Sequence, residues 1–178
     1  MQCGFVLFAT VLIMLIVPCM AQLPRTPDVE AQRAAMKKLS FLIGKWSGEA
    51  RVFRGPQPLE LVQTEETQYK LDGLLLIIEA SGHKKGDGSL ALQAYGIISY
   101  DDEINTYRFR AYNDGRWLES EVKLLEDGKV LTWEFSLGAI KTTSRLLIND
   151  RGEWTELHEI TIGAQAPQKF MELVVKPR

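Results

Sequence analysis

Residues 131–137 read Leu-Thr-Trp-Glu-Phe-Ser-Leu, and every second side chain in this stretch is large and apolar. Successive side chains of an extended strand point to opposite sides, so the apolar residues would share one face and the polar ones the other. The apolar face consists of Leu131, Trp133, Phe135 and Leu137. The stretch therefore predicts a β-strand with one buried face and one solvated face.

The same period of two continues outward along the chain, from the segment that begins at Gly44 to the C-terminus. Trp46, Gly48, Ala50 and Val52 alternate with polar residues. Turn signals such as Leu71-Asp72-Gly73, Asn113-Asp114-Gly115 and Glu126-Asp127-Gly128 separate about ten such segments. Consecutive hairpins without a long crossover favour a closed barrel over a sandwich, because closure leaves no exposed strand edge. We predict an all-β, ten-stranded antiparallel up-and-down barrel over residues 44–178.

One helix is predicted ahead of the barrel, over residues 28–39. Thr26 would cap it, with Pro27 at its first position and acidic residues near its positive end. Its apolar stripe would pack on the next element or close one end of it; the stripe is Val29, Ala35, Met36 and Leu39.

The first 21 residues have the pattern of a signal peptide. Residues 1–24 carry no charged side chain, and Phe5–Val17 is apolar except for Thr10, too short a run for a comfortable membrane span. We expect cleavage after Ala21, a linker over residues 22–27, a barrel domain over residues 28–178, and export to the periplasm or the extracellular space. The alternatives are an uncleaved anchor and lipidation of Cys19, which are the two ways in which this chain would contact a membrane.

Composition excludes several classes of function. The two cysteines, Cys3 and Cys19, both lie in the predicted signal peptide, so the mature domain would have neither disulfides nor thiolate chemistry. The formal net charge is −2 and no segment is a basic block. The sequence therefore contains no cluster of basic residues of the kind that binds nucleic-acid phosphates.

The stretch Leu39-Ser40-Phe41-Leu42-Ile43-Gly44-Lys45-Trp46-Ser47-Gly48-Glu49 resembles the calycin superfamily of lipocalins and fatty-acid-binding proteins. It is more similar to the nitrobindin-like families and to an uncharacterised family of exported, lipocalin-like bacterial proteins. The resemblance to the latter continues through the segments 71–73, 94–101, 107–113, 131–133 and 169–173. It implies a barrel in which Trp46 plugs the floor and Gly44 allows a close backbone approach.

A barrel of ten strands is wide enough to enclose a cavity, which predicts a pocket with mostly apolar walls. The alternation gives the inward candidates Tyr69, Ile78, Tyr95, Ile97, Phe109, Trp133, Phe135 and Thr142, to which Trp117 and His158 are added from the strands around them. Such aromatic residues also serve as core filler, and a one-residue bulge would reverse any of these assignments.

Two further interpretations involve chemistry. Glu119 and Glu121 share a face with Trp117, so they would either project into the cavity for acid/base work or lie on a solvated outer face. Glu65 and Glu66 form another carboxylate pair. His158 would bind haem iron if its face is interior, as a histidine does in nitrobindin-like proteins, although the closing strand has no histidine. No spacing suggests a metal site, and no nucleophile motif is present.

The sequence thus predicts an exported protein that holds a small apolar or amphipathic molecule in a β-barrel and needs no cofactor. The alternatives are a small barrel enzyme of the isomerase, cyclase or hydratase type, a haem-binding protein, and a filled barrel that serves as an interaction module. A pKa raised on an interior glutamate would favour the enzyme.

Overall fold

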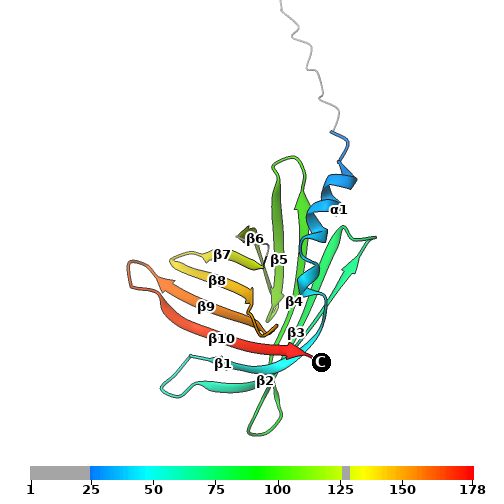
Figure 1. Cartoon of the computed structure of the whole chain (residues 1–178). Helices are drawn as coiled ribbons and strands as arrows, with labels where there is room; N and C mark the ends of the chain where they lie inside the picture. Colours follow the sequence, from blue (N-terminus) through cyan, green and yellow to red (C-terminus); the bar gives the residue numbers. More distant parts are fainter. Residues whose placement is uncertain (1–24, 126–128) are drawn as a thin grey trace, which may run out of the picture.

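A computed structural model describes residues 25–125 and 129–178, which form one closed antiparallel barrel preceded by a short helix (Figure 1). Around the barrel the order is β1-β10-β9-β8-β7-β6-β5-β4-β3-β2. Each strand therefore pairs with its neighbours in sequence, and β1 and β10 also pair with each other. The strands are β1 (Gly44–Val52), β2 (Leu59–Lys70), β3 (Leu75–Lys84), β4 (Leu90–Asp101), β5 (Thr106–Asn113), β6 (Arg116–Leu125), β7 (Val130–Leu137), β8 (Ile140–Ile148), β9 (Trp154–Ile162) and β10 (Gln168–Pro177).

This architecture confirms the predicted fold class, because consecutive hairpins close the sheet when β10 pairs with β1. The predicted signal peptide at residues 1–21, its cleavage site and the predicted turn at residues 126–128 lie outside the described residues.

The helix α1 spans Val29–Lys37 and is followed by the 3-10 turn η1 (Ser40–Leu42). Its N-cap is Asp28, whose Oδ1 accepts a hydrogen bond from the Ala31 backbone nitrogen at 2.9 Å. The prediction of Thr26 as the cap is therefore wrong by two residues. The backbone nitrogen of Asp28 also donates to Asp102 in the turn after β4, which holds Asp28 at the barrel and sets where the helix begins.

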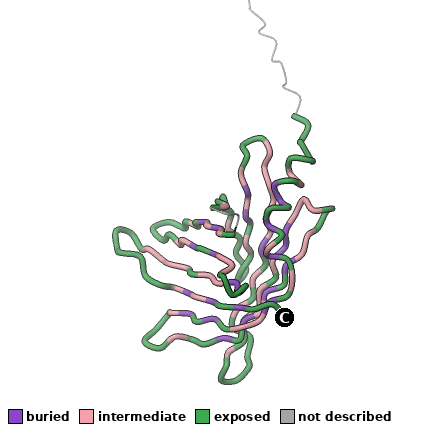
Figure 2. The backbone as a smooth tube through the Cα atoms, viewed as in Figure 1, coloured by how far each residue is buried: buried purple, intermediate pink, exposed green. Residues whose placement is uncertain are grey.

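The helix closes one end of the barrel (Figures 1 and 2). Two tyrosine hydroxyls from the barrel wall donate to its last carbonyls: Tyr107 to Ala35 and Tyr69 to Met36, each at 2.7 Å. Met36 and Leu39 of the predicted stripe are fully buried, whereas Val29 remains exposed. The apolar core therefore fills the helix end of the barrel.

Trp46 is buried at this end and packs edge-on against Trp154, with ring centroids 5.6 Å apart. Its indole nitrogen donates to the Leu42 carbonyl at 3.0 Å. Gly44 has a positive φ of 139°, but a Cβ there would meet nothing closer than 3.9 Å. The close backbone approach lies instead at Gly48, where a Cβ would come within 2.2 Å of the Val174 carbonyl oxygen. The sequence therefore placed this approach four residues too early in β1.

One seam of the barrel is less complete than the others. β6 and β7 share four register pairs, from Val122↔Trp133 to Leu125↔Val130. Residues 116–121 of β6 and 134–137 of β7 have no partner across this seam in the described register. The Glu134 backbone nitrogen instead donates to the Ser120 hydroxyl at 3.3 Å.

Candidate ligand-binding cavity

A cavity of about 470 Å³ occupies the half of the barrel away from α1. Arg54 and Asp114, which lie in the turns after β1 and β5, are among its lining residues. The helix contacts the turns after β2 and β4, through Asp72 and Asp102. In an up-and-down barrel these two sets of turns lie at opposite ends, so the cavity extends from the end opposite the helix. Its apolar walls are formed by Val52, Leu59, Ile78, Ala80, Leu92, Phe109, Ala111, Leu118, Trp133, Phe135, Phe170, Met171 and Leu173.

The deep part of the cavity carries a polar cluster, which we call the polar floor: Gln63, Glu65, Ser144, Glu156 and His158. Gln63 Nε2 donates to Glu65 Oε1 at 2.8 Å. On the opposite strands, Ser144 Oγ lies 2.8 Å from His158 Nδ1, and His158 Nε2 lies 2.8 Å from Glu156 Oε2. Trp154 Nε1 donates to the other Glu156 oxygen at 2.9 Å. These contacts join a hydroxyl, an imidazole and a carboxylate into one chain.

Burial raises the pKa of the Glu65 carboxyl well above its ordinary value. Desolvation is the largest cause, the negative charge of Glu156 adds to it, and the hydrogen bond from Gln63 opposes it. Glu65 is 5 % exposed, so little water reaches its carboxyl group. Glu65 is therefore a carboxylic acid that keeps its proton at pH values where surface glutamates are ionised.

Seven of the predicted pocket residues line the cavity: Tyr95 at its edge, and Ile78, Phe109, Trp133, Phe135, Thr142 and His158. Phe109 contacts Trp133 edge-on at 5.4 Å and Phe135 at 5.8 Å, so these rings form one continuous wall. Tyr69 lies instead at the helix end, where its hydroxyl contacts Met36.

Tyr95 and Trp117 were predicted to face the cavity, and this orientation is wrong for both. A Cβ on Gly96 would meet the Phe109 ring at 2.8 Å, which shows that Gly96 takes the inward position and its neighbour Tyr95 the outward one. Tyr95 contributes to the cavity edge, but it is 39 % exposed. Trp117 is 59 % exposed and lies under the Arg110 guanidinium at 5.2 Å. Ile97 follows the outward register of Tyr95 on β4.

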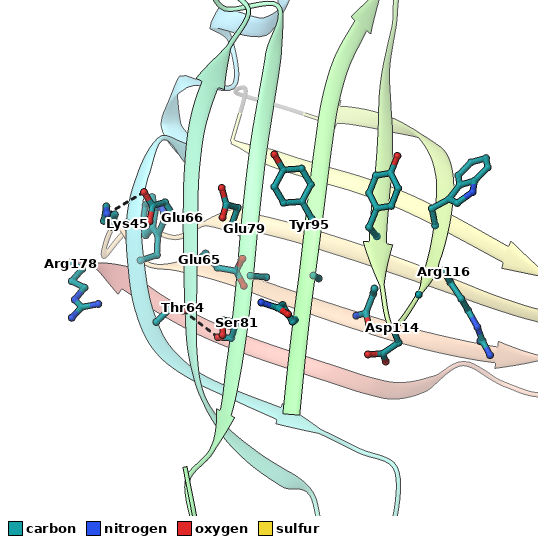
Figure 3. A pocket seen from close by; sticks show the side chains of 18 residues that line it. Lys45, Thr64, Glu65, Glu66, Glu79, Ser81, Tyr95, Asp114, Arg116 and Arg178 are labelled. Carbon is teal, nitrogen blue, oxygen red and sulfur yellow. Dashed lines mark hydrogen bonds and ion pairs between the residues drawn. The ribbon is translucent and has the colours of Figure 1, made fainter. Parts of the chain in front are cut away.

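Tyr95 and Trp117 belong to a shallow hollow of about 690 Å³ on the barrel wall (Figure 3). Lys45, Glu66, Glu79 and Tyr95 lie in one cross-strand row there, and the same register continues to Tyr112 and Trp117. Three charged groups are followed in this row by three exposed aromatic ones, and Lys45 pairs with Glu66, so the row is a solvated outer surface.

Glu119 and Glu121 also lie on this outer face. Glu119 forms an ion pair with Arg110, and Glu121 lies 3.4 Å from Arg108. The prediction that these two carboxylates lie on a solvated outer face is therefore confirmed, and neither projects into the cavity.

Sequence reasoning missed Gln63, Glu65, Ser144 and Glu156 as members of the site. The strand β2 carries polar side chains on both faces, so alternation alone could not show that Gln63 and Glu65 point inward. A weak signal was present on β9, where Glu156 and His158 share a face with Trp154 and Ile160.

The arrangement does not fit iron ligation by His158 as it stands. Both of its ring nitrogens hold hydrogen bonds, so one of them would have to be given up before the imidazole could bind haem. Within residues 25–125 and 129–178, no three His, Cys, Asp or Glu side chains gather as metal ligands would. In the same part of the chain, no helix has the length and apolar character needed to cross a membrane.

The ten strands close into an antiparallel up-and-down barrel that encloses the cavity. Among solved structures, the protein Rv2717c from M. tuberculosis has a similar fold, with a TM-score of 0.58 and 14% sequence identity. The match covers 81% of this chain and 97% of that one. No protein-family model and no curated protein matches the sequence. At this identity the similarity shows the shared barrel fold alone.

Proposed function

We propose that this protein is exported and binds a small apolar or amphipathic molecule inside the barrel. The observation that carries the proposal is the cavity of about 470 Å³, whose apolar walls end on a polar floor. Binding pockets for small molecules combine these two features, because apolar area supplies affinity and a few polar groups fix orientation. Export rests on the signal-peptide pattern of residues 1–21.

Native mass spectrometry of residues 22–178, purified from an exported preparation, tests the binding. We expect a co-purified small molecule without a haem absorbance band. The variant Ala111→Leu should reduce this extra mass, because Ala111 lines the cavity and the added side-chain carbons would occupy part of it. Tyr112→Leu is the matched control, since the next residue on β5 faces outward and is 39 % exposed.

A preparation that stays free of ligand and takes up neither apolar molecules nor amphiphiles would exclude the binding function. A haem absorbance band, lost in a His158 variant, would instead favour the haem-binding alternative. The intact mass of the exported protein should correspond to residues 22–178, and a mass that includes residues 1–21 would contradict cleavage.

A second candidate function, an enzyme that uses the polar floor, is favoured by the chain Ser144–His158–Glu156. A serine that donates to an imidazole held by a carboxylate has the connectivity of an activated nucleophile. A fluorophosphonate probe tests this function. Labelling of Ser144 that disappears in His158→Gln would support the enzyme function. A protein that is not labelled would exclude Ser144 as a nucleophile, and the polar floor would then serve ligand binding alone.

A further inference from the structure

The polar floor has a definite hydrogen-bond balance. Most of its donor groups already have acceptors: Gln63 donates to Glu65, Trp154 and His158 contact Glu156, and Ser144 contacts His158. The proton that Glu65 keeps is a further donor, and a cationic ligand group that pairs with this carboxyl would release that proton and leave a second carboxylate acceptor. Spare capacity remains on the acceptor side. Gln63 Oε1 is buried without a hydrogen-bond partner among the described residues, and each carboxyl oxygen has further lone pairs. A ligand group that reaches the floor therefore finds acceptors.

The charge balance of the floor points the same way. It contains two carboxyl groups, Glu65 and Glu156, whose proximity is one cause of the raised pKa of Glu65. Among the described residues that line the cavity, the arginines are Arg54 and Arg116, and these lie toward the open end with Asp114. A buried carboxylate without a cationic partner is costly, and a second anion beside it would be more so.

From these two balances we infer that the cavity binds amphiphiles whose buried end is a protonated amine, and that the polar floor discriminates against carboxylates. The inference rests on the proposed binding function and adds the chemical class of the ligand. An alkylammonium group has three hydrogen-bond donors and one positive charge, which match the free acceptors and the carboxyl groups. The alkyl chain lies along the wall formed by Phe109, Trp133 and Phe135.

Isothermal titration calorimetry with decylamine, decanol and decanoate tests this selectivity, because the three probes share one chain length. We expect decylamine to bind at least about tenfold more tightly than decanoate, with decanol between them. Glu65→Gln should reduce decylamine affinity about tenfold while preserving an acceptor at that position. The control Glu66→Gln removes an exposed carboxylate on the same strand and should leave the affinity unchanged.

The Trp154 indole resonance locates the bound head group in the unaltered protein. Decylamine at the floor competes for Glu156, so the N–H signal of Trp154 should shift, while that of the exposed Trp117 should not. Decanoate or decanol that binds as tightly as decylamine, or decylamine binding that leaves Trp154 unshifted, would overturn the amine inference with the binding function intact. If none of the three probes binds, the proposed function itself fails.

Discussion

Ser144 and His158 face each other across β8 and β9, with Ser144 Oγ 2.8 Å from His158 Nδ1. The other ring nitrogen, Nε2, lies 2.8 Å from Glu156 Oε2. An ionised carboxylate can only accept a hydrogen bond, so Nε2 carries the proton and donates it. In the neutral ring Nδ1 then accepts from the Ser144 hydroxyl. The barrel wall thus fixes both the orientation and the tautomer of the histidine.

We accordingly predict that nitrogen NMR at about pH 8, where an ordinary imidazole is neutral, finds His158 as the Nε2–H tautomer. Ser144→Ala should release Nδ1 and mix the tautomers. The exposed His83 on β3 serves as an internal control and should show the averaged signal of a solvated imidazole. An Nδ1–H tautomer at His158 would contradict the described chain of contacts.

Glu65→Gln should stabilise the protein at neutral pH. The folded-state pKa of Glu65 is raised, so the folded and unfolded proteins differ in protonation from the ordinary glutamate pKa, 4.5, up to that raised pKa. Over this window the wild type loses about 1.4 kcal/mol of unfolding free energy per pH unit, because the unfolded chain ionises first. Below pH 4.5 Glu65 is protonated in both the folded and the unfolded protein, so Glu65→Gln should give no increase in unfolding free energy from the raised pKa.

Urea denaturation at about pH 4 and about pH 8 measures this difference. Glu66→Gln is the control, because Glu66 lies on the outer face of the same strand and pairs with Lys45. A stabilisation by Glu65→Gln of equal size at both pH values would show that the raised pKa is not its cause.

Tyr107→Phe should weaken the attachment of the helix to the barrel end. The variant removes the Tyr107 donor to the Ala35 carbonyl, which keeps its hydrogen bond from the Lys38 backbone nitrogen, at a cost of about 0.5–1.5 kcal/mol of unfolding free energy in urea denaturation. Burial, with Tyr100 and Tyr69 nearby, raises the pKa of Tyr107 to about 12. The contribution of this hydroxyl is thus present below the ordinary tyrosine pKa of 10.0 and lost as pH rises from there to about 12. Tyr112→Phe, on the outer face, is the control and should leave the unfolding free energy unchanged.

Gly48→Ala should destabilise the barrel by roughly 2–3 kcal/mol or prevent its closure, as overpacking at a tight contact does. The new methyl group would lie 2.2 Å from the Val174 carbonyl oxygen, and backbone cannot move away as a flexible side chain can. Gly86→Ala is the matched control, since nothing lies within 4 Å of the added Cβ. Thermal unfolding of the two variants provides the comparison, and equal midpoints would disprove the close approach of β1 and β10.

Amide hydrogen exchange should be fastest, among the strands, at the incomplete seam. Residues 116–121 of β6 and 134–137 of β7 lack cross-strand partners there, whereas the pairs of β2 and β3 extend without interruption from Leu61↔Lys84 to Lys70↔Leu75. Amides without partners open at low free energy. Protection at the seam equal to that of β2 and β3 would show that the seam is closed in solution.

Much of the fold follows from the sequence alone. The alternation in residues 131–137 and the turn residues between segments indicated ten antiparallel strands, because a period of two and a tight turn are local properties of the chain. The inward positions of Phe109, Trp133 and Phe135 were predicted for the same reason, since apolar side chains outnumber polar ones on that face.

The register of β4 and the contents of the site were decided by tertiary structure. Tyr95 faces outward because the Phe109 ring fills the space beside Gly96, a contact between two strands that the pattern of one strand does not contain. The polar floor arises in the same way. Glu65 and Gln63 point inward because closure through β10 places that face of β2 inside, opposite Glu156 and His158 of β9. A glutamate in a strand has no local mark of burial, since its ionisation depends on the charges and the water that the rest of the fold places around it.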